Sequence, residues 1–525
     1  MGSFFNFFKR ISNEKESFKN IKKEFTRNGE LIYPGELLKI ASKKFAKKVA
    51  LVCDENKITY EEFYFRSVLL SKKLKDMGLE SGDKVILYSG NSIDFHIAYF
   101  AIWQIGAIVV PINIFLHDKE LLYVIKNCEA KAIFVSDEFK EKIEKLKKEE
   151  ELKNVKNIFS NDDIDWISDI EKIDFEVTCL KPEELCVLLY TSGTTGKPKG
   201  VMLSCNNVMI NTLQDYARLM HTDKRKNESF FSVLPLFHVF AQNTCLWLPV
   251  LTGSKIIIVK KIDRKLILKG LEKKPTLFFG FPALYGLLCL LKTAPLDSIR
   301  MFISGADAMP DKIRMAFSLI YGRKICAGYG LTEAAPVVAV NHENESLATQ
   351  FVGYPLQGLE CDIRDEQQNS LPIGKIGTLW IKGDNVMMGY YKSPEETQKV
   401  LKDGWLNTGD LGYKNEKGYL AISGRSKDLI IHKGFNIYPQ EIENILLSHP
   451  AVYQAAVIGR QDSSTGQIPV AYVGFKGENK NLEKILRDLC AANLATYKIP
   501  KKFFCLEKLP MNATGKIDKK RLQQI

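Results

Sequence analysis

The chain has 525 residues, of which 45% are hydrophobic and 26% are charged, and its formal net charge is +12. This composition excludes a disordered or fibrous chain, and the length exceeds what one hydrophobic core usually supports, so we expect a globular protein of at least two domains. The lysines are scattered and mixed with glutamates, as over residues 138–151. Such a pattern favours a solvated surface over a nucleic-acid-binding patch, and we expect no nucleic-acid partner.

Cysteine usage indicates a reducing compartment. The chain contains eleven cysteines, an odd number, and no C-x-x-C pair. Free thiols in the cytoplasm are therefore expected, and a zinc site or a disulfide framework is disfavoured. The longest uncharged stretches, residues 98–116 and 230–254, are interrupted by Pro, Gly, Gln or Asn. They predict buried strands and helices, not a membrane span.

The N-terminal segment, residues 1–29, is predicted to form a basic amphipathic helix. Lysines and one arginine lie between apolar residues at helical spacing, which are Phe4, Phe8, Ile11, Phe18, Ile21 and Phe25. Such a helix either lies on an anionic membrane, as a peripheral contact at its inner face through residues 1–25, or packs its apolar stripe on its own domain. We favour packing and keep both interpretations open.

Strand and helix patterns alternate over the first two thirds of the chain. Strands are predicted at 85–88 and 132–135 and a helix at 60–77. After residue 200, a helix capped by Ser204 runs to about 220, and later helices begin at Pro282 and after Pro310. Further strands are predicted at 255–259, 276–281, 301–304 and 325–328. This alternation is typical of twisted α/β layers.

The pattern changes in the last third of the chain. Short strands and glycine turns over 352–422 predict a small β subdomain, and a compact unit follows with helices at 439–448 and 482–494 and strands at 452–458 and 470–475. The predicted fold is α/β. A large N-terminal domain of α/β layers spans 30–426, with its β subdomain at about 350–424, and a small mobile α+β C-terminal domain spans 427–525.

A phosphate-binding loop is predicted over 190–201, Tyr-Thr-Ser-Gly-Thr-Thr-Gly-Lys-Pro-Lys-Gly-Val. Glycines let consecutive N–H groups form an anion cradle, hydroxyls donate to phosphate oxygens and lysines neutralise them. The loop is not a Walker A motif, because only two residues separate Gly193 from Gly196 and Pro198 follows Lys197. The candidate cradle residues are Thr191, Ser192, Gly193, Thr194, Thr195, Gly196 and Lys197.

Two tight turns follow predicted strands further along. The first contains Gly305, Ala306 and Asp307, and the second is Gly328-Tyr329-Gly330-Leu331-Thr332-Glu333. Ligands of open α/β sheets bind at the carboxyl ends of strands. The second turn offers an aromatic face, a hydroxyl and a carboxylate, which suit a nucleotide.

Three further candidates lie near the C-terminus. Asp410 and Arg425 stand at the two ends of a predicted hairpin, where a carboxylate accepting from both ribose hydroxyls and an arginine fork suit one sugar. The alternative is a pair of surface turns. Lys516 stands beside a glycine in the segment 512–518, a setting in which most lysines are only solvated.

These five signatures, in this order from residue 190 to residue 516, resemble those of the adenylate-forming enzymes, the superfamily of acyl-CoA synthetases, firefly luciferases and peptide-synthetase adenylation domains. The resemblance covers nearly the whole chain after about residue 30. It implies ATP, magnesium ion (Mg²⁺) and CoA as cofactors or co-substrates. By resemblance, Tyr329 stacks on adenine, Thr332 touches the α-phosphate, Glu333 holds Mg²⁺ together with Thr191, and Lys516 supplies the catalytic ammonium.

The resemblance also implies a hinge. Lys427 matches the position about which the small domain turns between two half-reactions, and Lys433 and Gly434 then face CoA. The alternative is an exposed linker lysine without a role.

Within the superfamily, the segments 234–241 (Leu-Pro-Leu-Phe-His-Val-Phe-Ala) and 330–337 look most like bacterial long-chain fatty-acid:CoA ligases. The uncharged stretch 230–251 is then an apolar acyl tunnel with His238 near the reacting carboxylate, and a core histidine is the alternative. Two features depart from the family: Asp384 stands where many relatives have proline, and the aromatic N-terminus has no counterpart.

We therefore expect an ATP-dependent fatty acid:CoA ligase that forms acyl-AMP and then acyl-CoA. One alternative is an acyl-AMP ligase loading a carrier protein, although the ordinary spacing of Glu333 and Asp410 argues against the insertion such relatives carry. A second is a ligase for aryl or short-chain acids. A third is a non-catalytic acyl or nucleotide-binding scaffold, which is expected to have lost Glu333, Asp410, Arg425 or Lys516.

Overall fold

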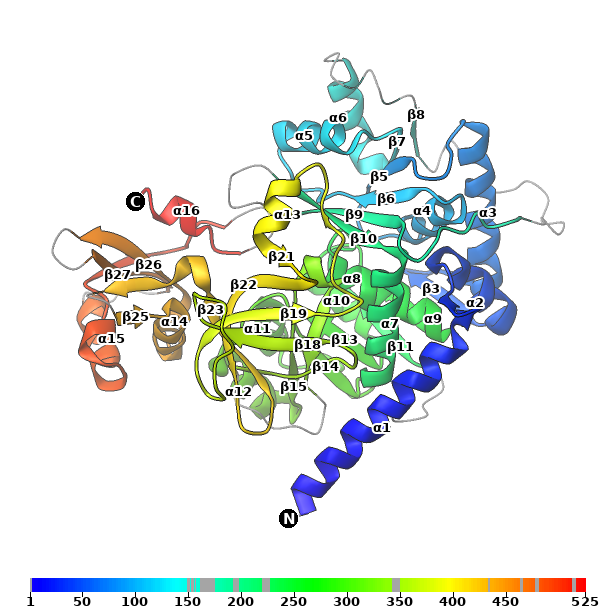
Figure 1. Ribbon diagram of the computed structural model, residues 1–525. Helices are drawn as coiled ribbons and strands as arrows, with labels where there is room; N and C mark the ends of the chain where they lie inside the picture. Colours follow the sequence, from blue (N-terminus) through cyan, green and yellow to red (C-terminus); the bar gives the residue numbers. More distant parts are fainter. Residues whose placement is uncertain are drawn as a thin grey trace.

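The computed structural model describes residues 2–148, 152, 155, 157–160, 175–191, 198–219, 227–341, 350–432, 435–462, 466–476, 481–511 and 516–525, and of residues 2–11 and 148 the backbone only. Figure 1 shows a large unit that contains most of the chain and a small unit, orange to red, at one side of it. We use "small unit" for residues 427–525. The domain boundaries at 30, 350 and 427 stay predictions.

A seven-stranded sheet forms the first β layer of the large unit, in the order β20-β10-β9-β6-β5-β7-β8. Helices α5 (Asp118–Cys128) and α6 (Asp137–Lys148) cover its outer face with one apolar cluster. The middle strands are parallel, whereas β10 is antiparallel to both of its neighbours, β9 and β20. Its strands are β5 (Lys84–Tyr88), β6 (Ile108–Pro111), β7 (Ala132–Val135), β8 (Asn157–Phe159), β9 (Leu185–Thr191), β10 (Lys199–Ser204) and β20 (Gly389–Tyr390).

A fourteen-stranded sheet forms the second β layer. Helices α10 (Arg264–Leu271), α11 (Pro282–Leu291) and α12 (Asp311–Tyr321) cover the outer face of its parallel part. That part comprises β3 (Val49–Cys53), β11 (Ser229–Ser232), β12 (Lys255–Ile258), β13 (Leu277–Gly280), β14 (Met301–Ser304) and β15 (Ile325–Gly330), with β4 (Asn56–Thr59) antiparallel at the edge. The predicted strands and helices of this region are confirmed, with ends shifted by one or two residues.

The predicted β subdomain continues this same sheet. Strand β16 (Val337–Val340) pairs antiparallel with β15 and passes the sheet on to the strands that follow. These are β17 (Phe351–Pro355), β18 (Glu360–Arg364), β19 (Gly377–Lys382), β21 (Leu401–Lys402), β22 (Trp405–Lys414) and β23 (Leu420–Arg425), with helix α13 (Pro394–Val400) before β21. Residues of the parallel and antiparallel parts are therefore held in one hydrogen-bonded framework.

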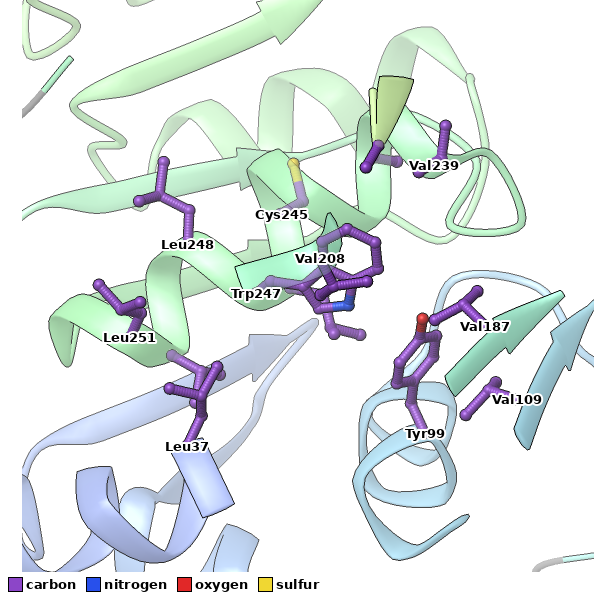
Figure 2. Close-up of a cluster of buried hydrophobic side chains, with 14 of the residues drawn as sticks. Leu37, Tyr99, Val109, Val187, Val208, Val239, Cys245, Trp247, Leu248 and Leu251 are labelled. Carbon is purple, nitrogen blue, oxygen red and sulfur yellow. The ribbon is translucent and has the colours of Figure 1, made fainter. Parts of the chain in front are cut away.

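A central helical layer fills the space between the two sheets. It comprises α2 (Leu37–Phe45), α3 (Tyr60–Asp76), α4 (Ile93–Gln104), α7 (Cys205–Leu219), α8 (Val239–Gln242), η4 (Asn243–Trp247) and α9 (Leu248–Thr252), whose buried side chains form one cluster with both sheets. Figure 2 shows Tyr99 of α4 and Trp247 of η4 beside Val109 and Val187 of the first sheet, and the two rings lie 6.4 Å apart. The prediction of buried helices in both uncharged stretches is confirmed. No helix of the described part of the chain is long and apolar enough to cross a membrane.

The N-terminal helix α1 (Gly2–Glu24) packs its second half on the large unit. Ile21 and Phe25 are buried and Phe18 is partly buried in the main core, and the Glu14 carboxylate pairs with Arg218 of α7 at 2.8 Å with both side chains buried. The packing interpretation is confirmed for this half. The other end leads away from the body (Figure 1), and the side chains of Phe4, Phe8 and Ile11 lie outside the described residues. Between α1 and α2 stand β1 (Thr26–Arg27), β2 (Glu30–Leu31) and η1 (Pro34–Glu36).

The small unit has a five-stranded sheet in the order β25-β24-β27-β26, with β28 paired to β27, and an apolar cluster of its own. Its elements are η6 (Ser426–Asp428), β24 (Ile430–His432), β25 (Phe435–Ile437), α14 (Pro439–Ser448), β26 (Val452–Asp462), β27 (Gly466–Phe475), α15 (Leu482–Asn493), η7 (Thr496–Lys498), β28 (Lys502–Leu506) and α16 (Lys519–Leu522). The predicted class, a large α/β part followed by a small α+β part, is confirmed.

Candidate functional site

Asp410, Arg425 and Tyr329 meet on three strands of the large sheet, and we call this group the Asp410 corner. Asp410 of β22 stands directly opposite Arg425 of β23. Its Oδ1 accepts from Arg425 Nε at 2.7 Å, and its Oδ2 accepts from the Tyr329 hydroxyl at 2.5 Å. The alternative of two surface turns is wrong, because Asp410 is 3% exposed and both residues lie within strands.

Burial and charge act in opposite directions on this carboxylate. Burial raises the pKa of Asp410 above its usual value, and Arg425, the Tyr329 hydrogen bond, Lys516 and Lys427 each lower it. The guanidinium therefore supports an ionised carboxylate that burial alone would disfavour. An ionised carboxylate still has free lone pairs, which suits it to accept further hydroxyl groups.

The turn after β15 aims Thr332 and Glu333 at the end of the sheet. β15 continues to Gly330, two residues beyond the predicted end, so that Gly328 and Tyr329 are strand residues. A side chain at position 330 is excluded, because a Cβ there would lie 2.2 Å from the Pro336 carbonyl oxygen. The chain turns tightly at this point, and Thr332 and Glu333 follow, half-buried, in η5 (Thr332–Ala334).

Tyr390 connects Glu333 to the predicted phosphate loop. The Tyr390 hydroxyl donates to Glu333 Oε1 at 2.9 Å, and burial, followed by the charge of Glu333, raises the pKa of Tyr390 so that it stays a donor. Its ring lies 5.2 Å from the Lys199 ammonium, which pairs with Glu396. Sequence reasoning missed Tyr390 and Glu396. The only local signal was an aromatic pair after Gly389.

The predicted phosphate loop connects two strands, β9 and β10, that pair antiparallel. Thr191 ends β9 opposite Lys199 at the start of β10. The other predicted cradle residues, Ser192, Gly193, Thr194, Thr195, Gly196 and Lys197, lie outside the described residues. The Lys199 charge is already balanced by Glu396, so this lysine is a weaker phosphate ligand than its sequence position indicates.

The turn after β14 receives a lysine from the small unit. Gly305 packs against the Phe240 ring, the Asp307 carboxylate accepts from the backbone N–H of Ala308 at 2.9 Å, and Ala306 adopts a positive φ of 68°. The Ala306 carbonyl oxygen accepts from Lys516 Nζ at 2.7 Å. This contact brings a residue of the C-terminal segment to the site, 210 positions along the chain.

The Lys516 charge also acts on two other candidates, since it lowers the pKa of both Asp410 and His238. His238 precedes α8 and is exposed, so the alternative of a core histidine is wrong. The ring is open to solvent but is crowded by protein atoms, and this partial desolvation, with a smaller effect of Lys516, lowers the pKa of His238 below its usual value. The imidazole is therefore neutral at pH 7 and adds no positive charge beside the ammonium.

Lys427 lies in η6, directly after the Asp410 corner, and is exposed. Desolvation lowers its pKa, and its charge still reaches Asp410. Lys433 and Gly434 lie outside the described residues. It stays a prediction that Lys427 is a hinge. It also stays a prediction that residues 433 and 434 face CoA.

The donor set around Glu333 fits Mg²⁺. This ion prefers hard oxygen ligands and is held by one or two protein groups together with phosphates and water. Glu333 offers a carboxylate and Thr191 a hydroxyl, whereas the described residues contain no group of three or more His, Cys, Asp or Glu side chains that could hold a metal alone. A site completed by a nucleotide suits these residues better than a preformed protein cage.

The chain is similar to known proteins in sequence and in fold. Residues 38–391 match the family model described as AMP-binding enzyme, and residues 441–516 match the AMP-binding enzyme C-terminal domain. The chain is 32% identical to a long-chain-fatty-acid–CoA ligase of Bacillus subtilis over 526 residues, 93% of each chain. It is 31% identical to a 2-succinylbenzoate–CoA ligase of Bacillus cereus over 484 residues, 91% of this chain and 96% of the relative.

A solved structure gives the same result for the fold. ATP-bound MatB from Rhodopseudomonas palustris matches with a TM-score of 0.85 at 28% identity, over 93% of this chain and 98% of that one. The two family models match in the expected order, and the relatives are above 30% identical along most of the sequence. The chain belongs to the AMP-binding enzymes, the adenylate-forming family.

Proposed function

We propose that this protein is an AMP-forming fatty acid:CoA ligase. The observation that carries the proposal is the contact between Lys516 and the Ala306 carbonyl, which brings an ammonium to the turn after β14, where its charge acts on Asp410 and His238. A carboxylate cannot be attacked directly by a thiol, because the leaving group would be an oxide. The acid is therefore activated first.

In the first step, a carboxylate oxygen of the acid bonds to the α-phosphorus of ATP and the bond to pyrophosphate breaks. Negative charge grows on the α-phosphate, where the Lys516 ammonium and the Thr332 hydroxyl stabilise it. Asp410 and Arg425 hold the ribose and Tyr329 lies along the base. Glu333 and Thr191 would hold Mg²⁺, which would neutralise charge on the phosphate oxygens.

In the second step, the CoA thiol loses its proton to solvent, its sulfur bonds to the acyl carbon, and AMP leaves with the electron pair of the anhydride bond. Space for the pantetheine arm must open where Lys516 stood. A turn of the small unit about Lys427 provides it, and residues 433 and 434 then face CoA. The neutral His238 imidazole lies beside the acyl group in both steps and, in the first step, adds no charge that repels Lys516.

Support for a fatty acid comes from the apolar segment after His238, in which Val239, Ala241, Leu246 and Leu248 are all buried. A relative named as a long-chain-fatty-acid ligase, at 32% identity, adds to this support. An acid with a polar distal group is a second candidate. Gln242 Nε2 and Asn243 Oδ1 are buried without a partner among the described residues, and such atoms favour a ligand that hydrogen-bonds to them.

A panel of carboxylic acids tests both candidates. Saturated acids of increasing length, aryl acids and dicarboxylic acids are assayed for pyrophosphate release with and without CoA. Highest activity with medium or long saturated acids and formation of acyl-CoA supports the proposal. Activation confined to aryl or dicarboxylic acids favours the second candidate, and acyl-AMP that reacts only with a carrier protein identifies the acyl-AMP ligase alternative.

Peripheral membrane contact through the N-terminus is a separate proposal. The second half of α1 is packed against the large unit through Glu14, Ile21 and Phe25. Any lipid contact is therefore made by the first turns of α1. Removal of residues 2–11 alone is expected to abolish salt-sensitive binding to anionic vesicles while thermal unfolding stays unchanged. Equal vesicle binding by the truncated and full chains would contradict the proposal.

A further inference from the structure

Two lysines donate across the boundary between the large and the small unit, in opposite directions. Lys516 of the small unit donates to the Ala306 carbonyl of the large unit. Lys312, in the first turn of α12 in the large unit, donates to the carbonyl oxygens of His449 at 3.2 Å, Pro450 at 3.0 Å and Val452 at 3.5 Å. Ala306 and Lys312 are six positions apart, so one short segment takes part in both contacts.

The acceptors of Lys312 are suited to a cation. His449 is the C-cap of α14, a helix of ten residues; Pro450 follows it and Val452 begins β26, so the His449 carbonyl belongs to the helix end and the other two lie just beyond it. The last carbonyls of a helix lack intrahelical partners and carry the negative end of the helix dipole. An ammonium has three donors, and here each finds a backbone oxygen. A neutral side chain of the same length makes none of these interactions.

We propose that Lys312 is a positioning residue that holds the small unit in the orientation in which Lys516 reaches the site. The contact is made to the backbone of an element that carries no substrate-facing residue, so it acts on orientation alone. A turn of the small unit about Lys427 separates Lys312 from α14. The contact therefore favours acyl-AMP formation and must break before the CoA step, a consequence that rests on the proposed function.

The orientation itself is tested first, without reference to activity. Genetically encoded spin labels at the exposed positions Lys402 of β21 and Ile485 of α15 report the distance between the units by pulsed electron paramagnetic resonance. We expect Lys312→Met to broaden the distance distribution or add a second distance, and Lys312→Arg to keep most of the wild-type distribution. Lys324→Met, at an exposed lysine beyond the end of α12, is the matched control. An unchanged distribution in Lys312→Met overturns the proposal.

The two half-reactions are then measured separately. Single-turnover acyl-AMP formation should slow about fivefold in Lys312→Met, the size of effect expected for one cation at a helix C-terminus. Thiolation of supplied acyl-AMP should stay at the wild-type rate or rise. An equal loss in both half-reactions would show a general structural role and contradict the inference. If the wild-type protein makes no acyl-AMP from any acid, the proposed function fails, and the distance measurement still decides the role of Lys312.

Discussion

The Asp410 corner and the Lys516 segment contribute to one site but are held in different ways. Tyr329, Asp410 and Arg425 stand on β15, β22 and β23, strands of one continuous sheet, and Tyr329 and Arg425 both bond to Asp410. Lys516 is exposed, follows the small unit's last strand, and reaches the site through a backbone carbonyl of the large unit. The first group is fixed by the fold, whereas the second depends on how two units meet.

This difference matches the demands of the two proposed steps. Both steps need the nucleotide to stay bound, so the groups that hold it gain from a rigid framework. Only the first step needs an ammonium at the α-phosphate. A residue that is required in one step and blocks the substrate in the next is best placed on a unit that can move as a rigid body. Variants on each side of the comparison should therefore affect different half-reactions.

The largest effect is expected from Lys516→Ala. Loss of one preorganised charge stabiliser lowers rates by about 10²–10³-fold. We expect acyl-AMP formation to fall by this factor and thiolation of supplied acyl-AMP to stay within about twofold, the non-additive scatter of a distant change. Single-turnover measurement of each half-reaction checks this, with the exposed Lys520 of α16, changed to Ala, as the control. An equal loss in both half-reactions would mean that Lys516 serves the whole cycle.

Asp410→Asn should affect both half-reactions alike. The amide has one acceptor oxygen where the carboxylate has two and carries no charge, so the charge-assisted hydrogen bond with Arg425, worth about 1.5–3 kcal/mol, is lost. We expect the KM for ATP to rise by roughly tenfold to a hundredfold, and the affinity for supplied acyl-AMP to fall similarly. Titration with ATP and with acyl-AMP measures whether both affinities fall by a similar factor. An effect on one half-reaction alone would contradict the conclusion that the Asp410 corner serves both steps.

Lys427→Pro should show the opposite selectivity to Lys516→Ala. Proline fixes φ at the substituted position and restricts Ser426 before it. If the small unit turns here, acyl-AMP still forms while transfer to CoA slows by on the order of tenfold, as expected when a conformational step is blocked. Lys427→Ala is the control that removes the charge and leaves the backbone free. Equal behaviour of both half-reactions in Lys427→Pro would place the hinge elsewhere.

Local signals predicted the regular elements of both units well. The strand at 301–304 and the helix at 439–448 were predicted with their observed ends. In each case a turn or a proline marks the boundary within a few residues. Such signals act over short range, and they are the ones that a single sequence contains.

The placement of Asp410 within a strand could not be predicted from such local signals. The sequence around Thr408, Gly409 and Asp410 looks like a turn, and Gly409 does adopt a positive φ of 70°. Pairing with β19 and β23 nevertheless places it within a ten-residue strand with a bulge. Tertiary pairing overrides the local preference. Tyr390 and Lys312 were missed for a related reason, because their partners lie 57 and about 140 positions away.

The smallest effect concerns a second buried carboxylate, Asp215 of α7. Asp410 is hydrogen-bonded by a cation and a hydroxyl, whereas Asp215 has neither bond among the described residues. Both of its oxygens are without a partner among the described residues, and the nearest cation, Arg218, is engaged by Glu14. Burial, only partly offset by Arg218, raises the pKa of Asp215 from 3.8 to about 8. Between these pH values the folded protein keeps a proton that the unfolded chain has lost. The free energy of unfolding therefore falls as pH rises through this window, by at most about 1.4 kcal/mol per pH unit.

Asp215→Asn removes this titration. Other groups titrate in both proteins, so the informative quantity is the difference in unfolding free energy between variant and wild type, measured by urea denaturation from pH 5 to pH 8. We expect the difference to shift in favour of the variant as pH rises, on the order of 1 kcal/mol per pH unit, and to level off above pH 8. Asp76→Asn, at an exposed aspartate of α3, is the matched control. A difference that does not change with pH would mean that the Asp215 carboxylate is ionised in the folded protein, and that burial without a partner does not separate it from Asp410.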